Sequence, residues 1–317
     1  MRQAVRMASL GSMFDAGDSG TFLGLPSASV DDVLGAGIVV IGAPCATPYS
    51  SVGPYCKDAP AAIRAASAMY SGIRHHHNFD LDGPMLIDGT SAVDLGDVPW
   101  DDTAYEANRA AIRHTCEAVL AAGAVPVVLG GDDSIPIPVL QAYHTAGPMT
   151  IVQIDAHIDW RDDRYGEKLG FSSTMRRASE QPHVWRIVQA GARGLGSARE
   201  AEVRDAKQWG ARIFTSRHIH HNGLKDVLET IPQDSGCLIA LDCDALDSSQ
   251  MPAVAYPSPG GLSFVQVTDL IAGVAAKARI AGFSMVEFVP GKDRDDTSAF
   301  TAARIAANLI GHIARQI

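Results

Sequence analysis

Two short acidic clusters contain the residue types with the clearest capacity for chemistry. Asp155-Ala-His157-Ile-Asp159 supplies two carboxylates and an imidazole, and Asp242-Cys-Asp244 supplies two more carboxylates. Grouped carboxylates repel one another and are costly to desolvate unless a cation lies among them. The residue types therefore predict a metal centre that holds divalent ions with a preference for oxygen ligands.

The segments that precede the two clusters indicate how they are positioned. A run of apolar, β-prone residues at 150–154 precedes the first cluster, and a similar run at 237–241 precedes the second. Such runs are typical of strands buried in a parallel sheet. Because parallel strands bring their carboxyl ends to one edge of the sheet, we expect the five side chains to converge there.

Strand-like and helical segments alternate along the chain, which predicts a parallel sheet covered by helices on both faces. Chain length allows a single large α/β domain, which we favour. The predicted strands are residues 37–41, 125–129, 150–154, 186–189, 212–214, 237–241 and 283–287. The amphipathic helical segments are 59–70, 104–122, 198–209, 264–279 and 298–316.

Composition limits the classes of partner. A formal net charge of -10 argues against nucleic acid or an anionic membrane surface, because either needs a concentrated basic face. The sequence has no long uncharged apolar run and no secretory leader, so we expect a cytoplasmic protein that does not enter a membrane. The five cysteines show no CxxC spacing, which favours reduced thiols over a disulfide framework or a zinc ribbon.

A third motif, Gly130-Gly-Asp-Asp-Ser134, follows the predicted strand at 125–129. Together with Asp-Ala-His-Ile-Asp and Leu-Asp-Cys-Asp-Ala-Leu-Asp, in this order, it resembles the three signatures of the ureohydrolase superfamily. That superfamily contains the arginases, the agmatinases and related guanidino hydrolases. Residues 21–26, 94–98 and 258–262 resemble agmatinase-like segments as well, so the resemblance covers nearly the whole chain.

The resemblance implies a three-layer α/β/α domain with a central eight-stranded parallel sheet, usually assembled into trimers or hexamers. We assign this single domain to residues 31–317. Residues 1–30, with scattered Gly, Ser and Asp, are interpreted as an N-terminal arm that packs on a neighbouring subunit.

By the same resemblance, the site holds two divalent metal ions, Mn²⁺ or Ni²⁺, which activate water for attack on a guanidinium carbon. Asp155 and Asp242 would bridge the ions, with position 133 and Asp159 completing one shell and His157 and Asp244 the other. The implied metal ligands are Asp133, Asp155, His157, Asp159, Asp242 and Asp244. The predicted catalytic residues are Asp159 and Glu287, and the predicted substrate-binding residues are Glu287, Phe171 and Trp160.

Three positions depart from the family pattern. Asp133 stands where the family usually has a histidine ligand, and it can be read either as a ligand or as the N-cap of the following helix. Phe171 stands where many relatives have a histidine, and a phenyl ring cannot transfer a proton. Ser258 replaces a common glutamate, which weakens the case for a diamine-like substrate such as agmatine.

The leading interpretation is therefore hydrolysis of a linear guanidine C–N bond, giving urea or a substituted urea and an amine. The substrate is expected to be a small cationic guanidino compound, including small or alkylated guanidines and biguanides. The alternative is a non-catalytic or weakly active subunit that stabilises a homologous active subunit in a hetero-oligomer, which Asp133 and Phe171 motivate. A single-zinc deacylase is a third interpretation, but we find neither its histidine dyad nor its catalytic tyrosine.

Overall fold

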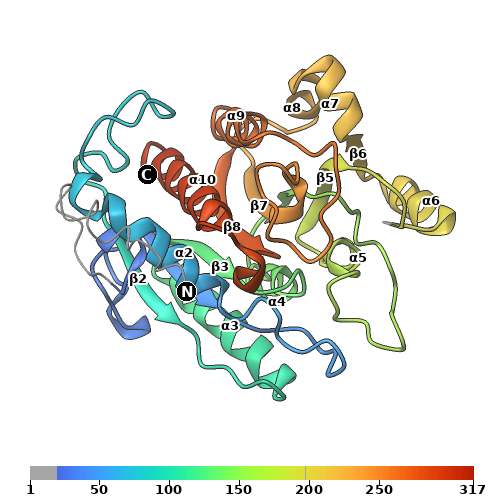
Figure 1. The fold of residues 1–317 in the computed structure, drawn as a ribbon, viewed down its shortest axis with the longest axis horizontal. Coiled ribbons are helices and arrows are strands. Elements are labelled where there is room, and N and C mark those ends of the chain that lie inside the picture. The colour runs from blue at the N-terminus through green and yellow to red at the C-terminus, as the bar shows by residue number, and fades with distance from the viewer. Residues whose placement is uncertain (1–19, 197) are drawn as a thin grey trace, which may run out of the picture.

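A single sheet of eight parallel strands organises the chain. The computed structural model describes residues 20–196 and 198–317. Figure 1 shows the sheet running from β2 on the left to β6 on the right, in the order β2-β1-β3-β8-β7-β4-β5-β6. The strands are β1 (Ile38–Ala43), β2 (Ala92–Asp97), β3 (Val125–Gly130), β4 (Met149–Ile154), β5 (Val184–Ala192), β6 (Arg212–Thr215), β7 (Gly236–Asp242) and β8 (Arg279–Val286).

Both faces of the sheet are buried, because side chains alternate between two separate cores. Along β1, Ile38 and Val40 contribute to one core, whereas Val39 and Ile41 contribute to the other. Strands that are apolar on both faces read as continuous hydrophobic runs, which is why the central strands were visible in the sequence.

Two layers of helices cover these faces (Figure 1). Helices α2 (Ala59–Ser67), α7 (Ser216–Asn222), α8 (Lys225–Glu229), α9 (Phe264–Ala275) and α10 (Thr297–Ala314) pack on one core. Helices α3 (Tyr105–Ala121), α4 (Pro136–Gln141), α5 (Thr174–Ser179) and α6 (Glu200–Trp209) pack on the other. The predicted three-layer α/β/α architecture with an eight-stranded parallel sheet is therefore confirmed.

A buried ion pair fastens α2 to β2 at one side of the sheet. Arg64 of α2 donates to both carboxylate oxygens of Asp94, at 2.8 and 2.9 Å, and both side chains are almost fully buried. The backbone N–H of Phe22 donates to the same carboxylate at 2.7 Å. This arrangement holds the first described residues, including the short 3₁₀ helix η2 (Phe22–Gly24), against the core of their own chain.

Most of the predicted N-terminal arm, residues 1–19, lies outside the described residues, so its contact with a neighbouring subunit stays a prediction.

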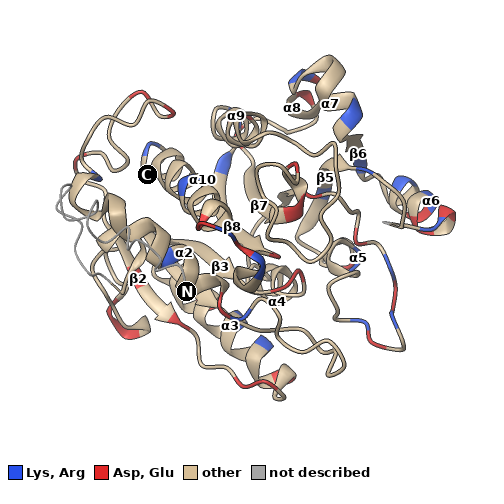
Figure 2. Cartoon of the chain, in the orientation of Figure 1, with Lys and Arg blue, Asp and Glu red and all other residues tan. Residues whose placement is uncertain are grey.

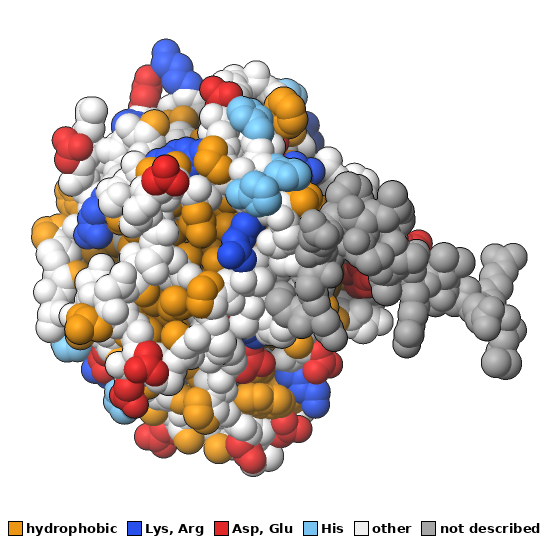
Figure 3. All heavy atoms as spheres, turned by 90° about the vertical axis from the view of Figure 1, so that its left-hand side faces the viewer, with side chains coloured by type: hydrophobic (Ala, Val, Ile, Leu, Met, Phe, Trp, Pro, Cys, Tyr) orange, Lys and Arg blue, Asp and Glu red, His pale blue; other side chains and the backbone are white. Residues whose placement is uncertain are grey.

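None of the described helices is long and apolar enough to cross a membrane. On the face drawn in Figure 3, hydrophobic side chains, in orange, are spread over much of the surface, and histidines, in pale blue, lie mostly in its upper part. The segment that precedes β2 contributes the exposed Phe79, whose ring contacts His77 with centroids 4.9 Å apart.

Candidate metal centre and active site

Four neighbouring strands in the middle of the sheet end at the candidate site. In sheet order, β3 leads into Asp132 and Asp133, β8 into Glu287, β7 into the Asp242 cluster, and β4 into the Asp155 cluster. Figure 2 shows acidic residues in red beside the end of β7, near the middle of the molecule. The structure therefore brings together three motifs that are far apart in the sequence.

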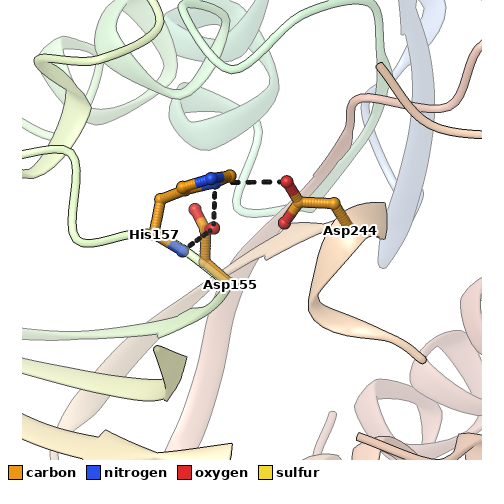
Figure 4. A group of neighbouring side chains, drawn as sticks. All are labelled: Asp155, His157 and Asp244. Atoms are coloured by element: carbon orange, nitrogen blue, oxygen red, sulfur yellow. Dashed lines mark hydrogen bonds and ion pairs between the residues drawn. The ribbon is translucent and has the colours of Figure 1, made fainter. Parts of the chain in front are cut away.

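The first ligand group consists of Asp155, His157 and Asp244, whose potential ligand atoms all lie within 4.8 Å of one another. Figure 4 shows the His157 ring above Asp155 and directed toward Asp244. His157 Nδ1 lies 3.1 Å from Asp244 Oδ2 and 3.4 Å from Asp155 Oδ1. The backbone N–H of His157 also donates to Asp155 Oδ1 at 2.6 Å, which fixes the turn after β4.

The second ligand group consists of Asp133, Asp155 and Asp242, again within 4.8 Å. Asp155 belongs to both groups, so its carboxylate lies between them. Asp133 Oδ2 is buried and has no hydrogen-bond partner among the described residues. Its neighbour Asp132 instead accepts from the N–H and hydroxyl of Ser134, at 3.0 and 2.5 Å, and so fixes the turn before α4.

Asp159 is held differently from the other predicted ligands. Its carboxylate belongs to neither of the two groups, although it lines the same cavity. Gln153 Nε2 donates to Asp159 Oδ2 and to Asp155 Oδ2, both at 2.7 Å. Gln189 in turn donates to Gln153 Oε1 at 2.5 Å. Two buried amides on β4 and β5 therefore set the relative positions of the two carboxylates.

Glu287 lies opposite these groups at the end of β8. Its Oε1 accepts a hydrogen bond from Tyr55 Oη at 2.6 Å and one from the Asp133 N–H at 2.9 Å. Its own N–H donates to the Gly131 carbonyl at 2.7 Å. Glu287 also has a φ of 67°, a left-handed conformation that is uncommon for this residue type and is often found at functional sites.

Burial and mutual repulsion dominate the electrostatics. Burial raises the pKa of Asp133 well above its ordinary value, and the charges of Asp159 and Asp155 add to the effect. Burial followed by the charge of Asp132 raises the pKa of Glu287 to about 8. A bound cation would relieve both costs, since it compensates desolvation and repulsion together.

The imidazole of His157 acts as a partial substitute for such a cation. Burial lowers the pKa of His157, but the bonds and charges of Asp155 and Asp244 outweigh burial and raise that pKa to about 12. The same contacts lower the pKa of Asp155 in spite of its burial. The two groups of carboxylate and imidazole donors, together with the buried and unpartnered Asp133 oxygen, fit divalent metal ions.

A cavity of 560 Å³ opens over the two ligand groups. Phe171 lines it, with its ring edge-to-face against Tyr49 and Tyr55 at centroid separations of 5.0 and 6.4 Å. The predicted contact of Trp160 with substrate is not supported: Trp160 is only 2% exposed, lies in a core, and contacts Trp209 rather than the cavity. The residue after the cluster turns back into the fold.

Sequence reasoning missed four residues that hold the site. Gln153 and Gln189 read as ordinary members of apolar strands, and Tyr55 lies in a turn without a motif. The fourth is Arg193, whose guanidinium donates to the carbonyls of Asp244 and Ser258 at 2.6 and 2.8 Å. The only signal available was a polar residue inside a buried strand, which is unfavourable unless it is hydrogen-bonded.

Comparison with known proteins decides the family. A model of the arginase family matches residues 36–311. The chain belongs to this family. The predicted resemblance is thereby confirmed, and with it the predicted enzyme class, a hydrolase of the C–N bonds of linear amidines.

Several relatives of this arginase-family chain have named activities. The N(1)-aminopropylagmatine ureohydrolase of Thermus thermophilus is 34% identical over 218 residues, which cover 68% of this chain and 70% of that protein. The guanidinobutyrase of Pseudomonas aeruginosa is 29% identical over 258 residues, which cover 79% and 78%. The solved structure of proclavaminate amidino hydrolase from Streptomyces clavuligerus matches with a TM-score of 0.83 and 26% identity, over 95% of this chain and 99% of that one.

Proposed function

We propose that this arginase-family chain hydrolyses the C–N bond of a linear guanidine compound and releases an amine with urea or a substituted urea. The observation that carries the proposal is the pair of ligand groups that share Asp155, next to a cavity that Glu287 also lines. The named activities of its relatives, which include an agmatine derivative and guanidinobutyrate among their substrates by name, support the same class of reaction.

The proposed cofactors are two divalent ions, Mn²⁺ or Ni²⁺. As the resemblance implies, Asp155 and Asp242 would contact both ions, Asp133 and Asp159 would complete one shell, and His157 and Asp244 would complete the other. Asp159 is the one of these six that neither ligand group includes. When bound, such ions lower the pKa of water toward neutrality and orient it for attack. The buried, unpartnered Oδ2 of Asp133 favours the ligand interpretation of this residue over the N-cap interpretation, because Asp132 already fixes the turn.

Glu287 is the proposed group that binds the guanidinium. A carboxylate offers two acceptor oxygens in one plane, which match the N–H groups of a guanidinium. Tyr55 and the Asp133 N–H hold Oε1, so the orientation of Glu287 is set before substrate arrives. Asp159 remains the second proposed catalytic residue, because its buried carboxylate lines the cavity beside Asp155.

We propose further that the protein is cytoplasmic and assembles into trimers or hexamers, as the sequence resemblance implies.

The test combines metal content with turnover. Protein produced with Mn²⁺ or Ni²⁺ is analysed for ions per chain, and urea and amine release are measured from a panel of guanidines. We expect two ions and turnover. Glu287→Gln is expected to keep both ions and lose substrate binding, while Glu229→Gln on the exposed face of α8 changes neither.

Absence of turnover would distinguish the hydrolase from the alternative function. One ion or none per chain, with no product from any guanidine, would reject the hydrolase and favour the subunit of a hetero-oligomer. If Glu287→Gln binds two ions and its KM is unchanged, the proposed metal centre would be supported and the proposed role of Glu287 in substrate binding would be rejected.

A further inference from the structure

The mouth of the cavity differs in charge from its floor. The acidic lining residues are all buried: Asp133, Asp159, Asp242, Asp244 and Glu287. The rim is exposed, with Tyr165 at 90% and Tyr256 at 77%. The loop from β4 to α5 contributes Arg161 and Arg164, the only basic residues in the described lining apart from His157, and both are half-buried where the acidic residues are buried. A ligand that spans the cavity therefore meets negative charge at one end and positive charge at the other.

Both arginines are available for a ligand. Neither guanidinium forms an ion pair with any carboxylate in the described parts of the chain, although two aspartates lie between them in sequence. Asp162 pairs instead with Arg177 at 2.8 Å, and Asp163 accepts from the Gly166 N–H at 3.0 Å. Within residues 20–196 and 198–317, the Arg161 side chain makes one hydrogen bond, a long one of 3.4 Å to the Gly196 carbonyl.

The backbone around the two arginines is nevertheless ordered. The Arg161 N–H donates to the Ser172 carbonyl at 3.1 Å, and Arg164 exchanges backbone hydrogen bonds with Glu167 at 2.9 and 3.1 Å. The Arg164 guanidinium lies 5.2 Å from the Tyr165 ring centroid. Burial and the charge of Glu167 raise the pKa of Tyr49, and the charges of Arg164 and Arg161 oppose that rise.

We propose that the substrate carries a carboxylate at the end opposite its guanidinium, and that Arg161 and Arg164 bind it. This inference rests on the proposed function and names its substrate class, a guanidino acid. Arginine matches a carboxylate with paired, charge-assisted hydrogen bonds. A distal ammonium would instead face two unpaired guanidinium charges, which disfavours a diamine-like substrate. The aromatic side chains of Tyr49, Tyr55 and Phe171 would contact the hydrocarbon chain between the two ends.

Figure 2 shows the same loop, between β4 and α5, projecting from the molecule with Lys and Arg in blue and acidic residues in red. The basic residues of this loop and of the following helix α5 differ in whether they form ion pairs. Arg176 and Arg177, which follow on α5, both pair with Glu180, at 3.1 and 3.0 Å. Arg176 lies outside the cavity lining, so it supplies a matched control for the removal of a single positive charge.

The experiment compares three ligands of similar length: 4-guanidinobutyrate, its neutral amide, and agmatine. Urea release gives KM and kcat, and calorimetry gives the Kd of each ligand for the metal-loaded protein independently of turnover. We expect the acid to bind about tenfold or more tightly than the amide or agmatine, since hydrogen bonds to charged groups are strong. Arg161→Gln and Arg164→Gln should each remove most of that preference with kcat nearly unchanged, while Arg176→Gln keeps it.

The outcomes separate this inference from the proposed function. Turnover of agmatine or the amide with no preference for the acid overturns the inferred carboxylate site and agrees with the proposed hydrolase activity. Absence of turnover rejects the hydrolase, and the Kd values still decide the rest: tighter binding of the acid that both Arg variants abolish supports the carboxylate site. Equal Kd values for the three ligands reject it.

Discussion

Gln153→Ala tests whether the amides beneath the metal centre position its ligands. The substitution removes the Nε2 donor that contacts Asp155 and Asp159, both at 2.7 Å. It also removes the Oε1 that accepts from Gln189. The two carboxylates would then lose their shared partner in a site where both are at most 8% exposed.

The expected magnitude follows from the number and kind of bonds. A hydrogen bond to a charged group contributes about 1.5 to 3 kcal/mol, and two are lost here. Part of that loss is recovered, because bound cations themselves stabilise the carboxylates. Outer partners of metal ligands typically contribute about 10- to 100-fold in metal affinity, which corresponds to about 1.4 to 2.8 kcal/mol.

We therefore expect Gln153→Ala to weaken Mn²⁺ binding about 10- to 100-fold, measured by calorimetry or by competition with a chelator. Excess metal should restore much of the lost activity. Gln233→Ala, at an exposed position, is the matched control and should leave Mn²⁺ affinity unchanged. A folded Gln153→Ala protein that binds Mn²⁺ as tightly as the parent would refute the positioning argument.

Three further predictions follow from other parts of the structure. Asp155→Ala, which removes the carboxylate common to both ligand groups, should abolish metal binding and activity together; retained turnover would contradict the metal mechanism. Arg64→Ala should lower the free energy of unfolding in urea by about 3 to 5 kcal/mol because Asp94 is left buried and unpaired. Arg113→Ala, which breaks the more accessible pair with Glu117, should lower the free energy of unfolding by only about 0 to 1 kcal/mol. Equal losses in the two variants would contradict a special role for the buried pair. In Gly131→Ala the added Cβ would overlap the Pro44 carbonyl, so the free energy of unfolding should fall by about 1 to 3 kcal/mol. Gly147→Ala is the control, because its Cβ would meet nothing within 4 Å. Equal thermal stability of the two variants would show that the backbone at Gly131 can shift to accept a Cβ.

The sequence predicted the strands that are apolar on both faces, and it placed the acidic clusters at the ends of two of them. It did not predict β2, because Asp94-Leu-Gly-Asp97 carries polar residues that interrupt the apolar run. The buried Asp94 carboxylate accepts hydrogen bonds from Arg64, from the Phe22 N–H and from the nearby Gly96 N–H. Arg64 and Phe22 lie in distant segments, so the local sequence does not indicate their contribution.

Short helices were also missing from the predicted segments. The run His218 to His221 lies in α7, which is outside the predicted helical segments. This helix begins at a Thr215 cap and packs through Ile219. Trp160 shows the reverse error, since proximity in sequence to a metal-binding cluster does not fix the direction of a side chain. Residue identity predicted the acidic clusters that the sheet brings together, whereas the supporting amides required the three-dimensional arrangement.

The position of β8 also constrains how the protein is made. β8 is the last strand of the chain, yet it lies between β3 and β7 and joins two half-sheets, β2-β1-β3 and β7-β4-β5-β6. Before β8 is synthesised, both half-sheets present an open edge, which is a template for incorrect pairing and aggregation. Asp133 belongs to one half and the Asp155 and Asp242 clusters belong to the other. The complete candidate site can therefore form only after β8 has been synthesised, and loss of β8 would separate its acidic clusters.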